Sequence, residues 1–274
     1  MTAVAASGYA APQGLLDFMR ARPLHEWADA SGQRWAWRDS GAAAPGVALL
    51  PGALGNGDVA WKIAQALERD FRVLTIHYPS GVGPVRLSQG LHELLGHLRA
   101  GPVALWGSSY GAWWAQQFAL QHGTDLRALW LGNTFTDGAD VAGSPLFDAQ
   151  WLQAASAAEV VERWHAATIA RPDSELRQLQ LYMLHHGLPA EAFRQRLLQV
   201  ARAPVLPANT EIPRLVLSGC ADDAIITPAV SARLQARYPG AQVIALDAGG
   251  HYPHVTEAEA LVPHLRRWAS ARQS

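Results

Sequence analysis

The sequence predicts an α/β fold built on a mostly parallel sheet with helices on both faces. Two observations support this prediction. Short apolar runs alternate with segments of helical periodicity along most of the 274 residues, and a Gly-x-Ser-x-Gly motif lies where one apolar run passes into a helix. Such alternation is typical of parallel sheets, because a helix usually provides the crossover from one parallel strand to the next.

The first predicted elements form an edge hairpin and the start of the parallel sheet. Residues 23–28 and 33–39 are predicted strands, and residues 29–32 form a polar turn that ends in Gly. Residues 47–50 are a short apolar strand. Asp58 is a good cap for the helix that we expect to extend to about residue 70.

Strand and helix patterns then alternate regularly over most of the remaining chain. Apolar runs and helical spacing of leucine, alanine and valine distinguish the two kinds of segment. The strands are predicted at residues 72–77, 102–106, 128–131, 214–218 and 242–246, and the helices at residues 88–99, 112–122, 228–238 and 256–271.

The alternation stops between residues 138 and 207, where only helix-like segments occur. These segments are residues 148–157, 158–167, 174–186 and 189–201. We expect a helical cap insertion at 138–207, and a core formed by residues 1–137 and 208–274. The insertion holds 6 arginines against 7 acidic residues, which makes it a poor match to a basic binding patch.

Composition indicates an ordinary globular protein. Hydrophobic residues make up 49% and charged residues 16%, and the formal net charge of −1 suggests no nucleic-acid partner. One cysteine excludes an internal disulfide. The alanine-rich residues 1–12 lack the features of a signal peptide, and no apolar stretch approaches the roughly 20 residues of a membrane span. We therefore expect a cytoplasmic monomer or homodimer that acts on a small-molecule substrate.

The motif Gly107-Ser108-Ser109-Tyr110-Gly111 is the strongest functional signal. It lies between a predicted strand and a predicted helix, where such a motif forms a tight turn that exposes its central serine. Glycines two positions before and after the serine let this turn close without a Cβ clash. Ser109 is therefore the candidate nucleophile, although a glycine-rich turn without chemistry would have the same pattern.

Two later segments offer the base and the acid that an activated serine requires. Asp222 and Asp223 follow the predicted strand at 214–218, and His251 follows the predicted strand at 242–246. The carboxyl ends of parallel strands are where open α/β sheets place their sites. We predict that Asp222 orients His251, and both Asp223 and Asp137 remain rival acids.

The backbone N–H groups of Tyr110 and of the loop after residue 50 are the expected donors to an oxyanion. Within that loop Ala53 is the first choice and Leu54 the second. Three of the 11 tryptophans are candidates for the lining of a substrate pocket, although a role in the core would also explain them: Trp113, Trp151 and Trp164.

Other motifs are absent or incomplete. Lys62 is the only lysine, and it is not part of a phosphate-binding loop. His251 and His254 have no carboxylate or thiol partners at metal-ligand spacing, so we expect no metal site. Cys220 has no obvious activating partner, which favours a packing role.

From about residue 23 to residue 268 the chain resembles the α/β-hydrolase superfamily. The order Ser109, Asp222, His251 is the order of the triad in that superfamily. The resemblance implies an α/β-hydrolase fold with an eight-stranded sheet, a cap after the sixth strand, and no metal or organic cofactor. Within the superfamily the chain resembles maspardin-like proteins in five stretches: Leu50-Pro51-Gly52, His77-Tyr78-Pro79, residues 131–137, residues 238–241 and residues 249–253.

Maspardin-like proteins have Asn at the position of His251, and they resemble non-catalytic members of the superfamily. The histidine of this chain favours an active enzyme. The resulting hypothesis is a serine hydrolase that cleaves an ester or thioester of a small apolar acyl group. A C–C bond hydrolase, an amidase or an acyltransferase would use the same triad, and a non-catalytic protein-binding module is the alternative from another class.

Overall fold

The structure, a computed structural model, describes residues 8–42, 44–209, 211–212 and 214–270. Two predictions concern residues outside this description. Residues 1–7 belong to the N-terminal stretch in which no signal peptide is expected, and residue 271 is the predicted end of the last helix. An eight-stranded sheet with the order β1-β2-β4-β3-β5-β6-β7-β8 runs through the molecule. Its strands are β1 (His25–Ala28), β2 (Arg34–Asp39), β3 (Gly46–Leu50), β4 (Arg72–His77), β5 (Val103–Ser108), β6 (Leu126–Gly132), β7 (Leu215–Cys220) and β8 (Gln242–Leu246).

The sheet confirms the predicted fold class. β1 pairs with β2 and β2 with β4 in antiparallel orientation, and all other neighbouring strands are parallel. Every residue of β3 and of β5 is buried. This follows from their sequences, because a parallel strand covered on both faces needs an apolar run rather than an alternating one.

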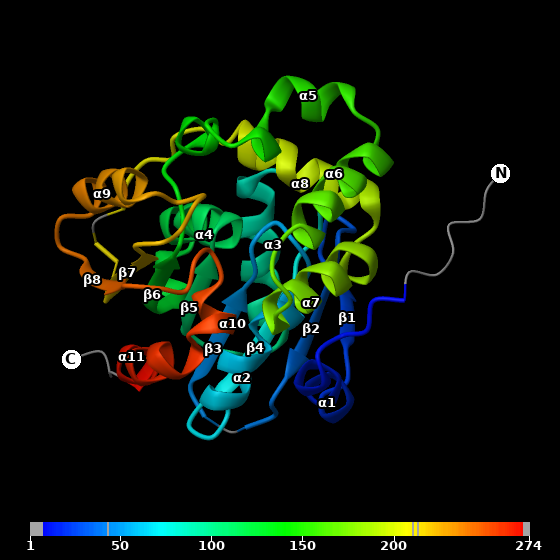
Figure 1. Ribbon diagram of the computed structural model, residues 1–274. Coiled ribbons are helices and arrows are strands. Elements are labelled where there is room, and N and C mark those ends of the chain that lie inside the picture. The colour runs from blue at the N-terminus through cyan, green and yellow to red at the C-terminus, as the bar shows by residue number, and fades with distance from the viewer. Residues whose placement is uncertain (1–7, 43, 210, 213, 271–274) are drawn as a thin grey trace.

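Helices cover both faces of the sheet (Figure 1). α2 packs against α1, α10 and α11, while α3 packs against α4. The α-helices outside the segment between β6 and β7 are α1 (Gln13–Ala21), α2 (Trp61–Leu67), α3 (Pro84–His97), α4 (Tyr110–Gln121), α9 (Pro228–Arg237), α10 (Pro253–Thr256) and α11 (Ala258–Ser270). No described helix is both long enough and apolar enough to cross a membrane.

Asp58 does not cap α2 as predicted, because its carboxylate pairs with Arg38, and Asn56 caps the 3-10 helix that precedes α2. Two helices also differ from the sequence-based expectation. Helix α1 was not predicted, and it buries Leu15 and Phe18. Helix α3 begins at Pro84, four residues before the predicted start, since proline is well suited to the first turn of a helix. Both differences arise where helical periodicity is short or begins inside a Pro/Gly-rich stretch.

Helices α5 (Ala149–Ala154), α6 (Ala157–Ile169), α7 (Glu175–Tyr182) and α8 (Ala190–Ala201) lie between β6 and β7 in the chain. In Figure 1, α5, α6 and α8 lie above the sheet. The N–H of Gly138 donates to the carbonyl of Ala203 at 2.8 Å, which brings the two ends of the segment together. Contacts of α8 with the loops after β3 and β4 place this helix over the carboxyl end of the sheet.

Candidate active site

Ser109 lies between the end of β5 and the start of α4. Its φ of 51° and ψ of −120° are a conformation that non-glycine residues rarely adopt. Hydrogen bonds from three directions hold this backbone: the Ser109 N–H donates to the Gly132 carbonyl at 2.9 Å, and the Ser109 carbonyl accepts from the Thr134 hydroxyl at 2.7 Å and from the Trp113 N–H at 2.9 Å. The surrounding structure therefore fixes Ser109 in a strained turn.

The glycines of the motif are required by close backbone contacts. A Cβ at Gly107 would lie 2.6 Å from the Cα of Ala112, and one at Gly111 would lie 2.3 Å from the carbonyl oxygen of Pro51. Real Cβ atoms do not approach backbone atoms so closely, so any side chain at either position would open the turn. The spacing predicted from the sequence thus has a steric cause.

His251 reaches Ser109 from the loop after β8. Its Nε2 lies 2.9 Å from the Ser109 Oγ, and its Nδ1 lies 2.9 Å from an Asp223 carboxylate oxygen. Gly249 and Gly250 precede it with φ values of 126° and 56°, which glycine adopts without strain. These glycines let the loop bend so that the imidazole lies between the hydroxyl and the carboxylate.

The structure contradicts the prediction that Asp222 orients His251, because Asp223 does so. The N–H of Asp223 donates to the Cys220 carbonyl at 3.3 Å, and this turn directs Asp223 inward. Asp222 is exposed, and it accepts the backbone N–H groups of Gly249 and Gly250 at 3.2 and 2.8 Å. Asp222 therefore shapes the histidine loop.

Asp137, the other rival, accepts the N–H of Ala139 at the start of a short 3-10 helix. It caps that helix, as aspartate often does at a helix N-terminus. The carboxylate bonded to His251 is that of Asp223.

The Asp223 carboxylate is fully enclosed and satisfied. It accepts the N–H groups of Ile225 and Ile226 at 2.8 and 2.9 Å, the amide of Asn133 at 2.9 Å, and the hydrogen bond with His251. Burial alone would raise the pKa of this carboxyl, but the charge and hydrogen bond of His251 and the other donors hold the pKa below its usual value. Asp223 is therefore ionised at neutral pH.

Asn133 is a site residue that sequence reasoning missed. It has a φ of 45°, and its amide donates both to Asp223 and to the carbonyl of Gly250, at 3.1 Å for the latter. It thereby links the acid to the loop that carries His251. Two signals in the sequence pointed to it: its place directly after a predicted strand, where polar residues meet the end of the sheet, and the resemblance of residues 131–137 to maspardin-like proteins.

The predicted oxyanion donors lie next to Ser109. Tyr110 is the first residue of α4, so its N–H has no partner within the helix. Ala53 and Leu54 line the pocket that also contains Ser109 and His251. Gly52 approaches so closely that a Cβ there would lie 3.2 Å from the Ser109 Cβ. All three predicted residues are thus near the serine, and their role as donors remains a prediction.

The pocket at Ser109 is small and mostly apolar. Its volume is about 20 Å³. The segment between β6 and β7 contributes the outer wall residues Phe147, Trp164 and Leu197, and the rest of the chain contributes Leu54, Ile225 and Tyr252 among others.

Of the three predicted pocket tryptophans, only Trp164 lines this pocket. The prediction is wrong for Trp113, which is buried in the core and stacks on Tyr110 and Phe135. It is also wrong for Trp151, which lies below the guanidinium of Arg163, 4.2 Å from the ring centroid. Helical periodicity gave no information about which tryptophan would turn inward.

His254 also lines the pocket, but it does not resemble a metal ligand. It is 3% exposed and packs edge-on against Trp106, with ring centroids 5.2 Å apart. Burial, with a smaller contribution from the charge of His251, lowers the pKa of His254 to about 3. His254 therefore lines the pocket as a neutral imidazole at neutral pH.

The pattern that describes the alpha/beta hydrolase family matches residues 47–264. This match spans β3 to α11 and includes Ser109, Asp223 and His251. The chain belongs to the alpha/beta hydrolase family.

Several individual proteins are similar to this alpha/beta hydrolase. Poly(3-hydroxyalkanoate) depolymerase of Ectopseudomonas oleovorans is 28% identical over 240 residues, which cover 80% of this chain and 82% of that protein. Human maspardin is 22% identical over 228 residues, 81% of this chain and 74% of maspardin, in agreement with the resemblance seen in the sequence. Polyketide synthase ThaQ of Burkholderia thailandensis is 28% identical over 250 residues, which cover 81% of this chain and only 12% of the synthase.

A solved structure shows the same fold. The enol-lactonase from Burkholderia xenovorans LB400 superposes with a TM-score of 0.75 at 18% identity, covering 91% of this chain and all of the lactonase.

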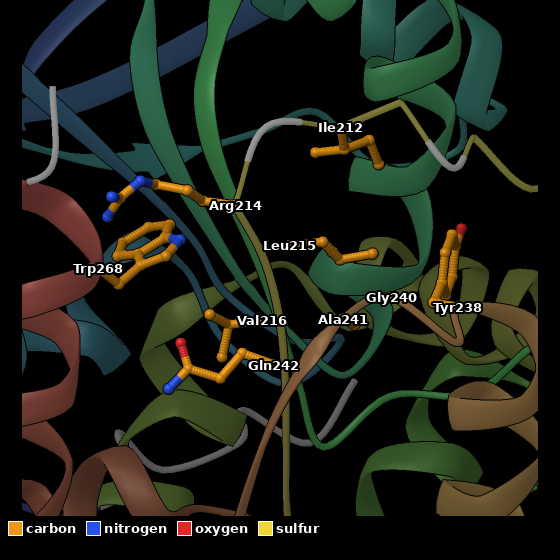
Figure 2. Close-up of a pocket in the computed structure, with 9 residues that line it drawn as sticks. All are labelled: Ile212, Arg214, Leu215, Val216, Tyr238, Gly240, Ala241, Gln242 and Trp268. Atoms are coloured by element: carbon orange, nitrogen blue, oxygen red, sulfur yellow. The ribbon is translucent and has the colours of Figure 1, made fainter. Parts of the chain in front are cut away.

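A larger cavity lies elsewhere in this alpha/beta hydrolase. It has a volume of about 380 Å³, and Figure 2 shows Arg214, Val216, Gln242 and Trp268 among the side chains that line it. It lies at the beginning of β7 and β8, whereas Ser109 follows the end of β5. Because these strands are parallel, the cavity lies at the amino ends of the strands, whereas the candidate active site lies at their carboxyl ends.

One group of described residues brings together three side chains of metal-ligating type, namely His92, His122 and Asp125. The two imidazoles stack with centroids 4.2 Å apart and planes 7° apart. A single ion cannot lie in the plane of two parallel stacked rings, so this arrangement is unlike a metal centre. His122 also lies at the far end of α4, roughly 20 Å from Ser109 at 1.5 Å per residue.

The two neighbouring aspartates should differ sharply when each is changed. Asp223→Asn removes the negative charge that holds His251 in its productive tautomer, and by comparison with known triads kcat should fall about 10⁴-fold. Asp222→Asn is the matched control. Its kcat should stay within about tenfold of the parent value, because Asp222 binds the backbone of the loop and does not contact the imidazole. Turnover of a p-nitrophenyl ester measures both. A collapse for Asp222→Asn with activity retained by Asp223→Asn would contradict the assignment.

Proposed function

We propose that this protein is a serine hydrolase that cleaves a carboxylic ester or thioester of a small apolar acyl group. The observation that carries the proposal is the continuous hydrogen-bonded chain from the Ser109 hydroxyl through both nitrogens of His251 to the buried carboxylate of Asp223. A hydroxyl, an imidazole and a carboxylate in this order are the parts that general-base activation of serine requires.

In the proposed reaction the Ser109 Oγ attacks the acyl carbon while the Nε2 of His251 takes the hydroxyl proton. The imidazolium then forms beside the ionised Asp223, whose low pKa keeps the negative charge in place. The carbonyl oxygen becomes an oxyanion that accepts hydrogen bonds from the N–H of Tyr110 and from the N–H of Ala53 or Leu54. Collapse of this intermediate breaks the bond to the alcohol or thiol, which leaves with the proton from His251.

Water completes the cycle. His251 takes a proton from a water molecule as that water attacks the acyl-enzyme, and it returns the proton to the Ser109 oxygen when the acid leaves. No oxidant, reductant or further group is required for these steps.

The apolar lining of the pocket supports the proposal that the acyl group of the substrate is uncharged. Leu54, Leu197 and Ile225 line the same pocket as the serine, and a charged acyl chain there would lose hydration without gaining a partner. The pocket volume of about 20 Å³ holds little more than one water molecule. Substrate entry therefore requires movement of the wall.

We assign that movement to residues 138–207 as a cap, with residues 1–137 and 208–274 as the core. The outer wall residues Phe147, Trp164 and Leu197 all belong to this segment. Movement of a segment over a site is a common way to admit a substrate and then exclude water. The names of two similar proteins, a depolymerase and an enol-lactonase, also support bond cleavage of this kind.

Ser109→Ala should abolish labelling by a fluorophosphonate probe and reduce esterase activity on the order of 10³-fold or more. The matched control is Ser108→Ala, since Ser108 is its buried neighbour at the end of β5. Probe labelling followed by gel fluorescence, with the melting temperature of each variant, measures the effect. Labelling that persists in Ser109→Ala, or that is lost only in Ser108→Ala, would reject the proposed nucleophile.

Trp164→Ala should shift acyl-chain preference toward longer chains, because it removes a large part of the pocket wall. Trp151→Ala is the control from the same segment, since Trp151 does not line the pocket. The ratio of kcat/KM for butyrate and octanoate p-nitrophenyl esters should change several-fold for Trp164→Ala and remain near the parent value for Trp151→Ala. An equal loss for every ester in Trp164→Ala would show a role in stability alone.

A further inference from the structure

Arg196 is a buried cation that joins α8 to two loops of the core. It is 1% exposed, and its guanidinium donates to the Gly55 carbonyl at 2.7 Å, the Tyr78 carbonyl at 2.6 Å and the Ser80 hydroxyl at 2.8 Å. Its central carbon lies 4.0 Å from the centroid of the Tyr78 ring. The three acceptors and the ring face surround the planar group.

Arg196 forms no ion pair within the part of the chain that the structure describes. Burial lowers the pKa of its guanidinium, while Tyr78 and Tyr110 act in the opposite direction. A buried cation without a carboxylate is costly, and hydrogen bonds to carbonyl groups are what compensate the lost hydration. A hydrophobic side chain would fill the same space more simply, so packing alone does not explain an arginine.

Arg196 contacts one short loop of the core directly through Gly55 and indirectly through Tyr78. We call residues 51–55, which follow β3, the oxyanion loop because it holds the candidate donors Ala53 and Leu54. Arg196 binds its last carbonyl, that of Gly55, directly. It also holds Tyr78, whose one hydroxyl proton is shared between the carbonyls of Pro51 and Gly52, each 2.9 Å from the hydroxyl oxygen.

The Gly52 carbonyl and the Ala53 N–H belong to the same peptide unit. A trans peptide is planar, so its C=O and N–H point in opposite directions. When the Tyr78 hydroxyl fixes the Gly52 carbonyl, it also fixes the direction of the Ala53 N–H. A Cβ at Gly52 would lie 3.8 Å from the Ser109 Oγ, so the peptide that joins Gly52 to Ala53 starts beside the serine.

We propose that Arg196 is a positioning residue for oxyanion stabilisation: through Gly55 and Tyr78 it holds the oxyanion loop so that the Ala53 N–H is aimed at the developing charge. This inference rests on the proposed serine-hydrolase function. It also makes closure of α8 a requirement for an assembled site, because Arg196 comes from the cap segment and the loop from the core.

Lysine cannot replace this group. An ammonium carries three donors at one point, whereas the guanidinium presents donors from a rigid plane to acceptors on different loops. Arg196→Lys keeps the positive charge and loses the simultaneous contacts with Gly55, Tyr78 and Ser80. Tyr78→Phe keeps the ring beneath the guanidinium and loses only the hydroxyl that fixes Pro51 and Gly52.

The test compares Arg196→Lys and Tyr78→Phe with Arg194→Lys, a control from the same helix that pairs with Glu191 in α8. We measure kcat and KM per fluorophosphonate-labelled site, the affinity for an alkyl trifluoromethyl ketone that forms a tetrahedral adduct, and the melting temperature. Arg196→Lys should lose about 10² in kcat with KM within threefold, and ketone affinity should fall in parallel. Tyr78→Phe should lose about tenfold in both with little change in melting temperature.

The control should match the parent in all measurements. The inference is overturned if kcat and ketone affinity stay within twofold in Tyr78→Phe and in any folded Arg196→Lys protein, even where the melting temperature falls. If Arg196→Lys does not fold, Tyr78→Phe decides alone. A parent enzyme that neither binds the probe nor hydrolyses esters would instead overturn the proposed function, and this inference with it.

Discussion

The strained backbone of Ser109 is the constraint on which the rest of the site depends. A positive φ at a serine persists only when the surroundings leave no alternative. Here β6 supplies the acceptor for its N–H, Thr134 binds its carbonyl, and the backbones of Gly107 and Gly111 approach their neighbours without room for a side chain. The hydroxyl is thereby fixed at the carboxyl end of β5, and His251 and Asp223 follow it in the hydrogen-bonded chain.

The neighbouring acids Asp222 and Asp223 show how one turn serves two purposes. Asp223 points into the protein and binds His251, while Asp222 points outward and binds the backbone of the glycines before that histidine. Both contacts act on the same loop. The inner acid orients the imidazole, and the outer acid fixes the chain that carries it, so the position of His251 is determined from both sides of the turn.

The sequence was sufficient for the fold class and for bringing Ser109 and His251 together, because strand runs, helical spacing and the glycine motif are local signals. The choice between Asp222 and Asp223 was wrong, since it depends on which way a turn directs consecutive side chains, and that is set by the bond to the Cys220 carbonyl. Nothing in the sequence indicated that Arg196 is buried or that it binds the loops of the core. Its partners Gly55 and Tyr78 are 141 and 118 positions away, and helical periodicity cannot show that an arginine is buried.

In the proposed mechanism, the oxyanion loop and the start of α4 aim their N–H groups at one point beside Ser109. A crystal structure of the protein after reaction with an alkyl fluorophosphonate tests this arrangement directly, because the phosphoryl oxygen occupies the place of the oxyanion. We expect a covalent bond to the Ser109 Oγ and a phosphoryl oxygen about 2.7–3.1 Å from the N–H nitrogens of Tyr110 and of Ala53 or Leu54. An adduct on another residue, or a phosphoryl oxygen directed away from both N–H groups, would contradict it.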